Sequence, residues 1–225
     1  MPRKKYDSRK VNIVGDFFEN IFAEMVKAER APVDEGDFFI PEANIGIEVK
    51  GSDSNHEWRL PLHQLEFYQR MSKGFPLDNF FFFLFCYKNP YIRNGAGRIT
   101  SLSLFDDEME VRSFIVANPD TLYVVDIALI QHLFSICRVS DNSIPMHRGV
   151  QSLNVRPTLM RLLADGGWKS MAAKIRGLEQ RSFSSEFVFA PDMLESHKVK
   201  LNIVTIGRAK ETQKLIECFK PGILT

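Results

Sequence analysis

Two carboxylates and a lysine stand at a spacing that suits metal-assisted hydrolysis. Asp37 is followed, after ten intervening residues, by Glu48-Val49-Lys50. Hydrolysis of a phosphodiester needs a divalent cation that polarises the phosphoryl oxygen and lowers the pKa of a bound water. Mg²⁺ prefers oxygen ligands, commonly one or two carboxylates together with water and phosphate. Asp37, Glu48 and the carbonyl of Val49 are therefore candidate metal ligands.

Lys50 is the candidate for the cation that completes such a site. Residues two apart on a strand point to the same face, so Lys50 is expected beside Glu48. There its ammonium could position the attacking water and offset charge in the transition state. The bare pattern is weak by itself, because a solvated strand end with a surface Glu–Lys pair has the same sequence.

The surrounding sequence predicts the elements that would position these residues. Apolar residues at helical spacing, all-apolar runs and Gly- or Pro-containing turns mark the boundaries. We expect helices at 14–28, 62–71, 129–136, 157–164 and 209–219, strands at 36–40, 45–50, 80–87, 99–105 and 122–127, further strands near Phe187 and Leu201, and a loop at 51–55. The uninterrupted apolar run from Phe80 to Tyr87 indicates a strand covered on both faces of an α/β sheet.

Three flanking polar residues strengthen the prediction of a site. Glu19 lies beside the apolar stripe of the first predicted helix, from which its carboxylate could approach the strand that carries Asp37. Gln64 and Tyr68 lie one turn apart on the next helix and hence on one face. The order helix, strand, Glu-x-Lys strand, helix and apolar strand forms a compact α/β unit.

These residues together resemble a known nuclease family. The segments Gly15-x-x-x-Glu19, Asp37, Ile47-Glu48-Val49-Lys50 and Arg59-x-Pro-x-x-Gln64 resemble the archaeal-type Holliday junction resolvases. That family has the restriction-endonuclease-like PD-(D/E)xK fold. The resemblance covers roughly residues 12–135, and its motifs are short. No proline precedes Asp37, and Gln64-x-x-x-Tyr68 also resembles the RecB-like exonucleases.

The resemblance implies a role for each matching residue. Asp37, Glu48 and Glu19 would bind Mg²⁺ or Mn²⁺ directly or support its ligands, Lys50 would be the catalytic lysine, and Gln64 would orient the site. The implied activity is that of a Mg²⁺-dependent deoxyribonuclease, an endonuclease selective for DNA structure.

The resemblance also leaves alternatives open and implies partners. A type II restriction endonuclease with a C-terminal target-recognition region is one alternative, and a non-catalytic nucleic-acid-binding protein is another. The expected partner is branched or duplex DNA. Because members of this fold that cut both strands commonly pair their active sites, a homodimer is also implied.

Four residues near the site are candidates for contact with DNA. His56, Arg59 and His63 surround the start of the predicted second helix, and Tyr68 follows on that helix. Cationic and polar side chains there could bind the phosphate backbone. An exposed loop with a helix start explains the histidines equally well.

Composition and charge set the broad class. The chain has 225 residues, of which 44% are hydrophobic, enough for a real core. Residues 1–137 hold 15 Lys and Arg against 20 Asp and Glu, whereas residues 138–225 hold 14 against 8. We therefore expect a nuclease core over 1–137, with a mixed central sheet flanked by helices. A smaller, basic α+β region over 138–225 would serve DNA binding or dimerisation.

Cysteine usage and hydropathy indicate the compartment. The three cysteines are odd in number and far apart, which fits a reducing cytoplasm better than a disulfide framework. No apolar run reaches the roughly 18 residues of a membrane span. A cytoplasmic protein without a membrane partner is expected.

Overall fold

The computed structural model describes residues 8–31, 36–73, 79–89, 105, 107–139, 146–147, 150–165, 178–188, 198–221 and 223. The helices are α1 (Ser8–Met25), α2 (Leu62–Lys73), α3 (Glu108–Ala117), α4 (Ile127–Val139), α5 (Pro157–Ala164) and α8 (Ala209–Glu217). The strands are β1 (Glu29–Arg30), β2 (Phe38–Ile40), β3 (Ile45–Asp53), β4 (Trp58–Pro61), β5 (Asn79–Tyr87), β6 (Pro119–Asp126), β7 (Met146–His147), β8 (Val150–Val155), β9 (Leu178–Val188) and β10 (Lys198–Arg208). No helix within these described ranges is both long and apolar enough to cross a bilayer.

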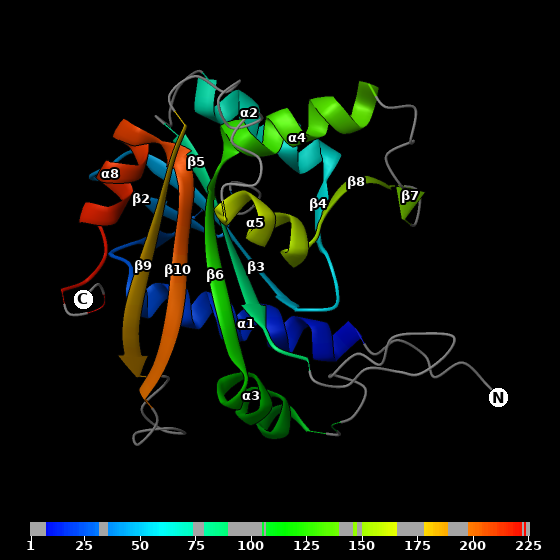
Figure 1. Ribbon diagram of the computed structural model, residues 1–225, viewed down its shortest axis with the longest axis vertical. Coiled ribbons are helices and arrows are strands. Elements are labelled where there is room, and N and C mark those ends of the chain that lie inside the picture. Colours follow the sequence, from blue (N-terminus) through cyan, green and yellow to red (C-terminus); the bar gives the residue numbers. More distant parts are fainter. Residues whose placement is uncertain are drawn as a thin grey trace.

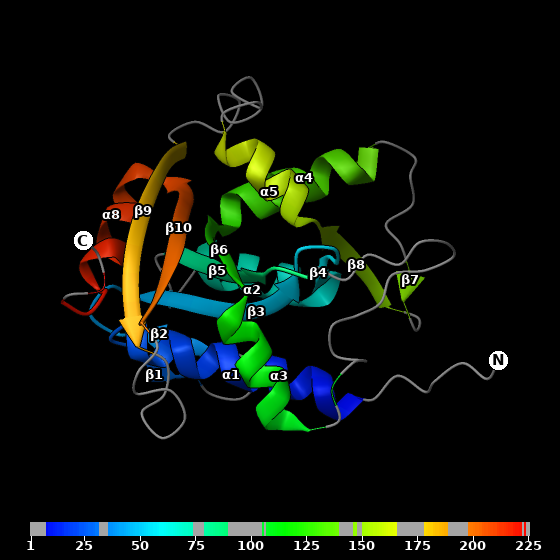
Figure 2. The same ribbon diagram turned by 60° about the horizontal axis from the view of Figure 1, so that its bottom comes forward.

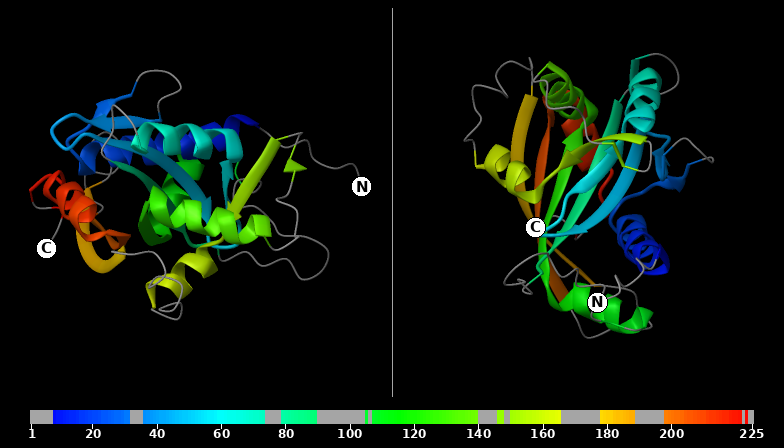
Figure 3. Two further views of the ribbon diagram at one scale, coloured as in Figure 1. Left: turned by 90° about the horizontal axis from the view of Figure 1, so that it is seen from above. Right: turned by 90° about the vertical axis from the view of Figure 1, so that its right-hand side faces the viewer.

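A mixed seven-stranded sheet forms the centre of the molecule. Its order is β1-β2-β3-β5-β6-β10-β9 (Figure 1). β3 pairs with β5 in parallel, β5 with β6 antiparallel, and β6 with β10 in parallel. The strands fan apart with the usual twist of such sheets (Figure 3, right). The predicted α/β class with a mixed central sheet is therefore confirmed.

β5 separates two apolar cores. All nine of its residues are buried, as the apolar run predicted. Phe81, Phe83 and Phe85 point into the core beneath α1 and α3, whereas Phe80 and Phe82 point into the core beneath α2, α4 and α5. Figure 2 shows α1 and α3 on one side of the strands, with α4 and α5 on the other. Each fully buried Phe contributes roughly 1.5–3 kcal/mol.

Strands after residue 137 complete the same sheets as the first half of the chain. β10 pairs with β6 over five residue pairs, from Thr121 to Val125 of β6, and β9 pairs along the whole of β10. β8 pairs with β4 in a separate three-stranded sheet, which lies at the opposite end of the molecule from α8 (Figure 3, left). The expected division at residue 137 therefore does not correspond to a break in the sheet.

Most predicted elements occur, with two exceptions. The loop expected at 51–55 is wrong for residues 51–53, because β3 continues to Asp53 through its parallel pairing with β5 as far as Tyr87, whereas 54–55 form a turn. The strand expected at 99–105 lies outside the described residues, apart from Phe105. The sequence pattern does not predict β1, β4, β7, β8 or α3.

Gly51 lets α1 pack closely on β3. A Cβ atom there would lie 2.3 Å from Cδ2 of Phe18 and 3.0 Å from Cγ1 of Val14. The Phe18 ring is itself stacked on Phe85 at 4.8 Å between centroids, so it has little room to retreat. The sequence composition suggests a loop glycine, whereas the structure uses the missing side chain for packing between layers.

We predict that Gly51→Ala lowers the free energy of unfolding by about 1–3 kcal/mol, because the methyl group must push α1 off the sheet. Gly15→Ala is the matched control. Gly15 lies inside α1, and a methyl group added to it would have nothing within 4 Å, so alanine there should stabilise the helix by up to about 1 kcal/mol. Urea unfolding of both variants measures this difference, and equal behaviour of the two would contradict the packing role.

Candidate active site

Asp37 is fixed where β2 meets β3. The antiparallel ladder of these strands pairs Phe38 with Ile47, and the Asp37 amide donates to the Ile47 carbonyl at 2.9 Å. Its carboxylate Oδ2 accepts the amide of Val49 at 2.7 Å. Just beyond the end of the β2–β3 ladder, the Asp37 side chain thus takes the place of a backbone carbonyl as acceptor. This contact directs the carboxylate towards residues 48–50.

Glu48 is a buried carboxylate with two side-chain partners. Its neighbours Ile47 and Val49 pack towards α1, so alternation along β3 turns Glu48 and Lys50 towards α2. Glu48 is only 3% exposed. The Lys50 ammonium binds its Oε1, and the Tyr68 hydroxyl donates to its Oε2 at 2.6 Å. Both carboxylate oxygens are therefore held in a defined orientation.

Tyr68 is held by the sheet beneath it. Its ring stacks on Phe80 with 4.0 Å between centroids and 11° between planes, and its side chain is buried. Its burial leaves the Tyr68 side chain little exposed surface, and its expected contact with DNA stays a prediction. The tyrosine fixes Glu48 from the α2 side.

The electrostatics show that the site concentrates negative charge. Burial, followed by the charge of Glu48, raises the pKa of Asp37 to about 6, although Lys50 and the Val49 amide act in the opposite direction. Burial alone would lower the pKa of Lys50, but Glu48 and Asp37 outweigh it, so the pKa of Lys50 lies above its ordinary value. Lys50 therefore stays protonated, and Asp37 is mostly ionised at pH values above about 6.

The donor set consists of oxygen atoms. The N–H and C=O of a strand residue point to the same side, so the Val49 carbonyl faces the side from which its amide reaches Asp37. Within the described residues, no three or more His, Cys, Asp and Glu side chains gather in a manner that could hold a metal ion. Two carboxylates and a carbonyl fit Mg²⁺ or Mn²⁺, because such ions commonly keep several water and phosphate ligands.

Glu19 approaches the site but has another partner. It pairs with the guanidinium of Arg30 on β1, while remaining close enough to contribute to the raised pKa of Asp37. Sequence reasoning misses Arg30, because the Arg-Ala-Pro segment indicates only the end of the first helix. No local pattern could have revealed its role, because β1 is two residues long.

The other residues predicted for the site are His56, Arg59, His63 and Gln64, and they differ in how they lie relative to Asp37 and Glu48. Asp53 lies five residues beyond Glu48 on β3, about 16 Å at the rise of a strand, and its Oδ1 is 2.7 Å from Nδ1 of His56. The structure therefore does not bring His56 to the carboxylates. Arg59 on β4 and His63 on α2 are exposed, and Gln64 is half-buried one turn before Tyr68. Their predicted roles stay predictions.

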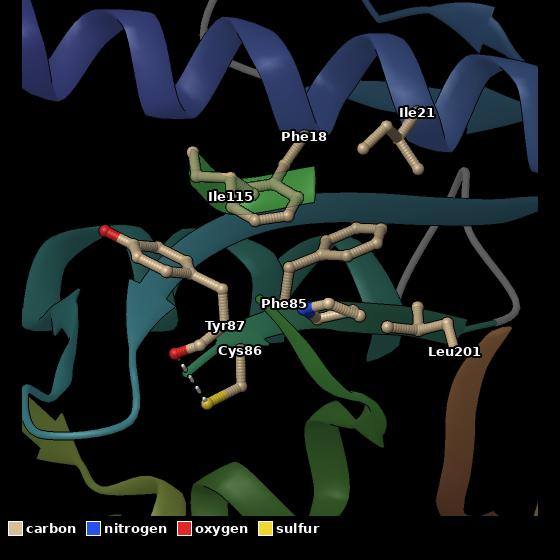
Figure 4. Close-up of a pocket in the computed structure, with 8 residues that line it drawn as sticks. Phe18, Ile21, Phe85, Cys86, Tyr87, Ile115 and Leu201 are labelled. Atoms are coloured by element: carbon tan, nitrogen blue, oxygen red, sulfur yellow. Dashed lines mark hydrogen bonds between the residues drawn. The ribbon is translucent and has the colours of Figure 1, made fainter. Parts of the chain in front are cut away.

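A small apolar hollow lies on the opposite face of the sheet. Phe18 and Ile21 of α1, Ile115 of α3, and Phe85 and Leu201 of the sheet surround it (Figure 4). The thiol of Cys86 points away from this hollow towards the other face (Figure 4). An apolar lining offers nothing to bind a phosphate, so the carboxylate site is the better candidate.

Comparison with protein-family models, curated proteins and solved structures found no significant match.

We predict that Asp37→Asn stabilises the metal-free protein near neutral pH. A pKa of about 6 in the folded state, against roughly 3.9 in the unfolded chain, means that the folded state holds the proton longer. Stability due to this group is therefore present at low pH and is lost as the pH rises from about 4 to 6. The amide should remove this loss and raise the free energy of unfolding by about 1–2 kcal/mol at pH ~7.5, with little effect at pH ~4.

Thermal unfolding in a chelator across this pH range checks the prediction. The matched control is Asp16→Asn, because Asp16 is exposed on α1 and should change stability by less than about 0.5 kcal/mol. A destabilised Asp37→Asn protein at neutral pH would show that the carboxylate is there for folding.

Proposed function

We propose that this chain is a metal-dependent endonuclease that hydrolyses DNA phosphodiesters on a restriction-endonuclease-like core. The observation that carries the proposal is the convergence of Asp37, Glu48 and Lys50 at the edge of β3, with a buried, oriented Glu48 and a strongly perturbed Asp37. A carboxylate with a perturbed pKa beside a second carboxylate and a lysine is typical of functional sites.

Asp37, Glu48 and the carbonyl of Val49 would hold a Mg²⁺ or Mn²⁺ ion. When bound, the ion supplies polarisation of the phosphoryl oxygen and a lowered pKa for a coordinated water. The protein contributes orientation. The Val49 amide holds Oδ2 of Asp37, and Lys50 and Tyr68 each hold one oxygen of Glu48.

Lys50 supplies the positive charge of the site. Its ammonium is held by Glu48 on a strand that cannot rotate, and its side chain is still 31% exposed. A phosphate that enters from solvent can therefore meet this ammonium directly. There it would stabilise the charge that develops on the phosphoryl oxygens and position the attacking water.

The finer assignment is a structure-selective enzyme similar to Holliday junction resolvases, acting as a homodimer on branched DNA. The motif resemblance supports it. The pairing of β9 and β10 into the sheet that carries the site also favours it over a restriction enzyme, because these strands are part of the fold that supports the site. A separate target-recognition module would not be expected to share this sheet.

We predict that Lys50→Ala and Glu48→Gln each reduce the cleavage rate by about 10²–10⁴-fold in Mg²⁺, with DNA binding largely intact. The measurement is cleavage of a panel of four-way junctions, flaps, single strands and plain duplex. Lys210→Ala is the matched control, because Lys210 is an exposed lysine on α8. Full activity of the Lys50→Ala protein would contradict the mechanism, and no cleavage by the unaltered protein on any substrate would contradict the function.

We predict a smaller effect for Tyr68→Phe. The ring can keep its stacking on Phe80 while the hydrogen bond to Glu48 is lost, which is a net loss of about 1.5–3 kcal/mol for a charged acceptor. If that bond orients Glu48 for the reaction, the maximal rate should fall by roughly 10-fold with little change in KM. An unchanged rate together with reduced stability would mean that Tyr68 is only a structural partner of Glu48.

A further inference from the structure

An ion pair between β1 and α1 borders the candidate site. The Arg30 guanidinium binds Glu19, with 59% of the Arg30 side chain and 21% of the Glu19 side chain exposed. The guanidinium carbon also lies 4.7 Å from the centre of the Phe38 ring. Arg30 is therefore held from two sides and still presents much of its surface to solvent.

The pair is tied to the carboxylates of the candidate site by short connections. Arg30 stands opposite Phe38 in the β1–β2 ladder, and the next amide, that of Ala31, donates to the carbonyl of Asp37 at 3.1 Å. The charge of Glu19 acts on both Asp37 and Lys50. Arg30 therefore lies on the edge strand next to the residue that carries the Asp37 carboxylate.

Stability alone does not explain an arginine here. Exposed ion pairs contribute about 0–1 kcal/mol, and β1 is a two-residue strand. An arginine does, however, carry five N–H donors in a rigid fork that matches the oxygens of a phosphate. A carboxylate on one side of that fork fixes its direction and leaves its remaining donors for a second anion.

We infer that Arg30 binds a backbone phosphate next to the one that is cleaved, and that Glu19 is a positioning residue for Arg30 instead of a metal ligand. This inference rests on the proposed function. Glu19 and the Phe38 ring hold the guanidinium on the α1 side of the sheet, whereas Glu48 lies on the α2 side. Without Glu19, the guanidinium would be free to pair with another carboxylate, Asp37 included, which would weaken the attraction of the site for a cation.

Two measurements that need no cleavage test this inference. The first is binding of a fluorescent duplex or four-way junction in a chelator. Arg30→Ala and Glu19→Gln should each weaken binding by about 5–10-fold, and the double variant should be no weaker than Arg30→Ala alone, since partners in one interaction are not additive. Arg30→Ala should also reduce the slope of log affinity against log salt concentration by about one, the contribution of one phosphate contact.

The second measurement is calorimetric titration with Mn²⁺ in the absence of DNA. Glu19→Gln should keep the affinity of the unaltered protein, whereas Asp37→Asn should lose it by at least about 10-fold. Loss of Mn²⁺ affinity in Glu19→Gln equal to that in Asp37→Asn would overturn the positioning role while leaving the proposed function intact. Failure of the unaltered protein to bind Mn²⁺ or to cleave any DNA would instead contradict the proposed function itself.

Arg112 provides the matched control for DNA binding. It also pairs with a glutamate, Glu108, and its guanidinium carbon lies 5.9 Å from the centre of the Phe17 ring, but it is on α3. Arg112→Ala should leave affinity and salt dependence unchanged. An equal loss in Arg30→Ala and Arg112→Ala, or no loss in either, would overturn the phosphate-binding role. A charge-swapped Glu19→Arg, Arg30→Glu protein should recover part of the affinity lost by Arg30→Glu alone.

Discussion

The carboxylate of Glu48 is the constraint around which the site is built. A charge that is 3% exposed is tolerated only when it is paired and its remaining lone pairs are satisfied. Lys50 supplies the charge, and Tyr68 supplies the hydrogen bond. Each partner is itself held in place. Lys50 lies on the same strand as Glu48, and the Tyr68 ring stacks on the ring of Phe80. The apolar strand β5 thus supports Glu48 indirectly, through the stacked rings of Phe80 and Tyr68.

The same sheet explains why Asp37 and Glu48 face one another at all. β5 is buried on both faces and holds β3 in parallel over nine residue pairs, so β3 cannot slip by one residue without turning its apolar side chains out of the core. A fixed β3 fixes the register of the short strand β2, and through it the position of Asp37. The mutual repulsion of the two carboxylates is opposed by this framework. An isolated hairpin would relieve the repulsion by moving apart, whereas a strand locked into a seven-stranded sheet cannot.

The sequence was informative where a residue's role depends on near neighbours. Alternation placed Glu48 and Lys50 on one face, the run of aromatics from Phe80 identified the central strand, and helical spacing identified α1 and α2. It was misleading where distant segments decide. The composition around Gly51 is that of a loop, but the pairing of Gly51 with Phe85 continues the strand. Tyr68 was expected at a DNA surface, and no local pattern showed that it binds Glu48. No sequence pattern indicates a role for Arg30, because that role depends on Glu19, eleven residues earlier, and on a two-residue strand. The strands β9 and β10 were expected, but no local pattern showed that they complete the sheet of the first half.

Two glutamates lie near Asp37, and their different surroundings suit them to different roles. Glu48 lies on the α2 face of the sheet, where burial and two fixed partners leave it in a single orientation suited to a cation. Glu19 lies on α1, more exposed, with a guanidinium as its partner. Both glutamates are ion-paired, Glu19 with Arg30 and Glu48 with Lys50. Glu48 raises the pKa of Asp37 more than Glu19 does, so a cation bound to Asp37 would relieve mainly the repulsion with Glu48. Under the proposed function, the cation would lie between Asp37 and Glu48, with positive charge from Lys50 on the α2 side and from Arg30 on the α1 side. A phosphate backbone would then reach the edge of β3 between these two positive charges.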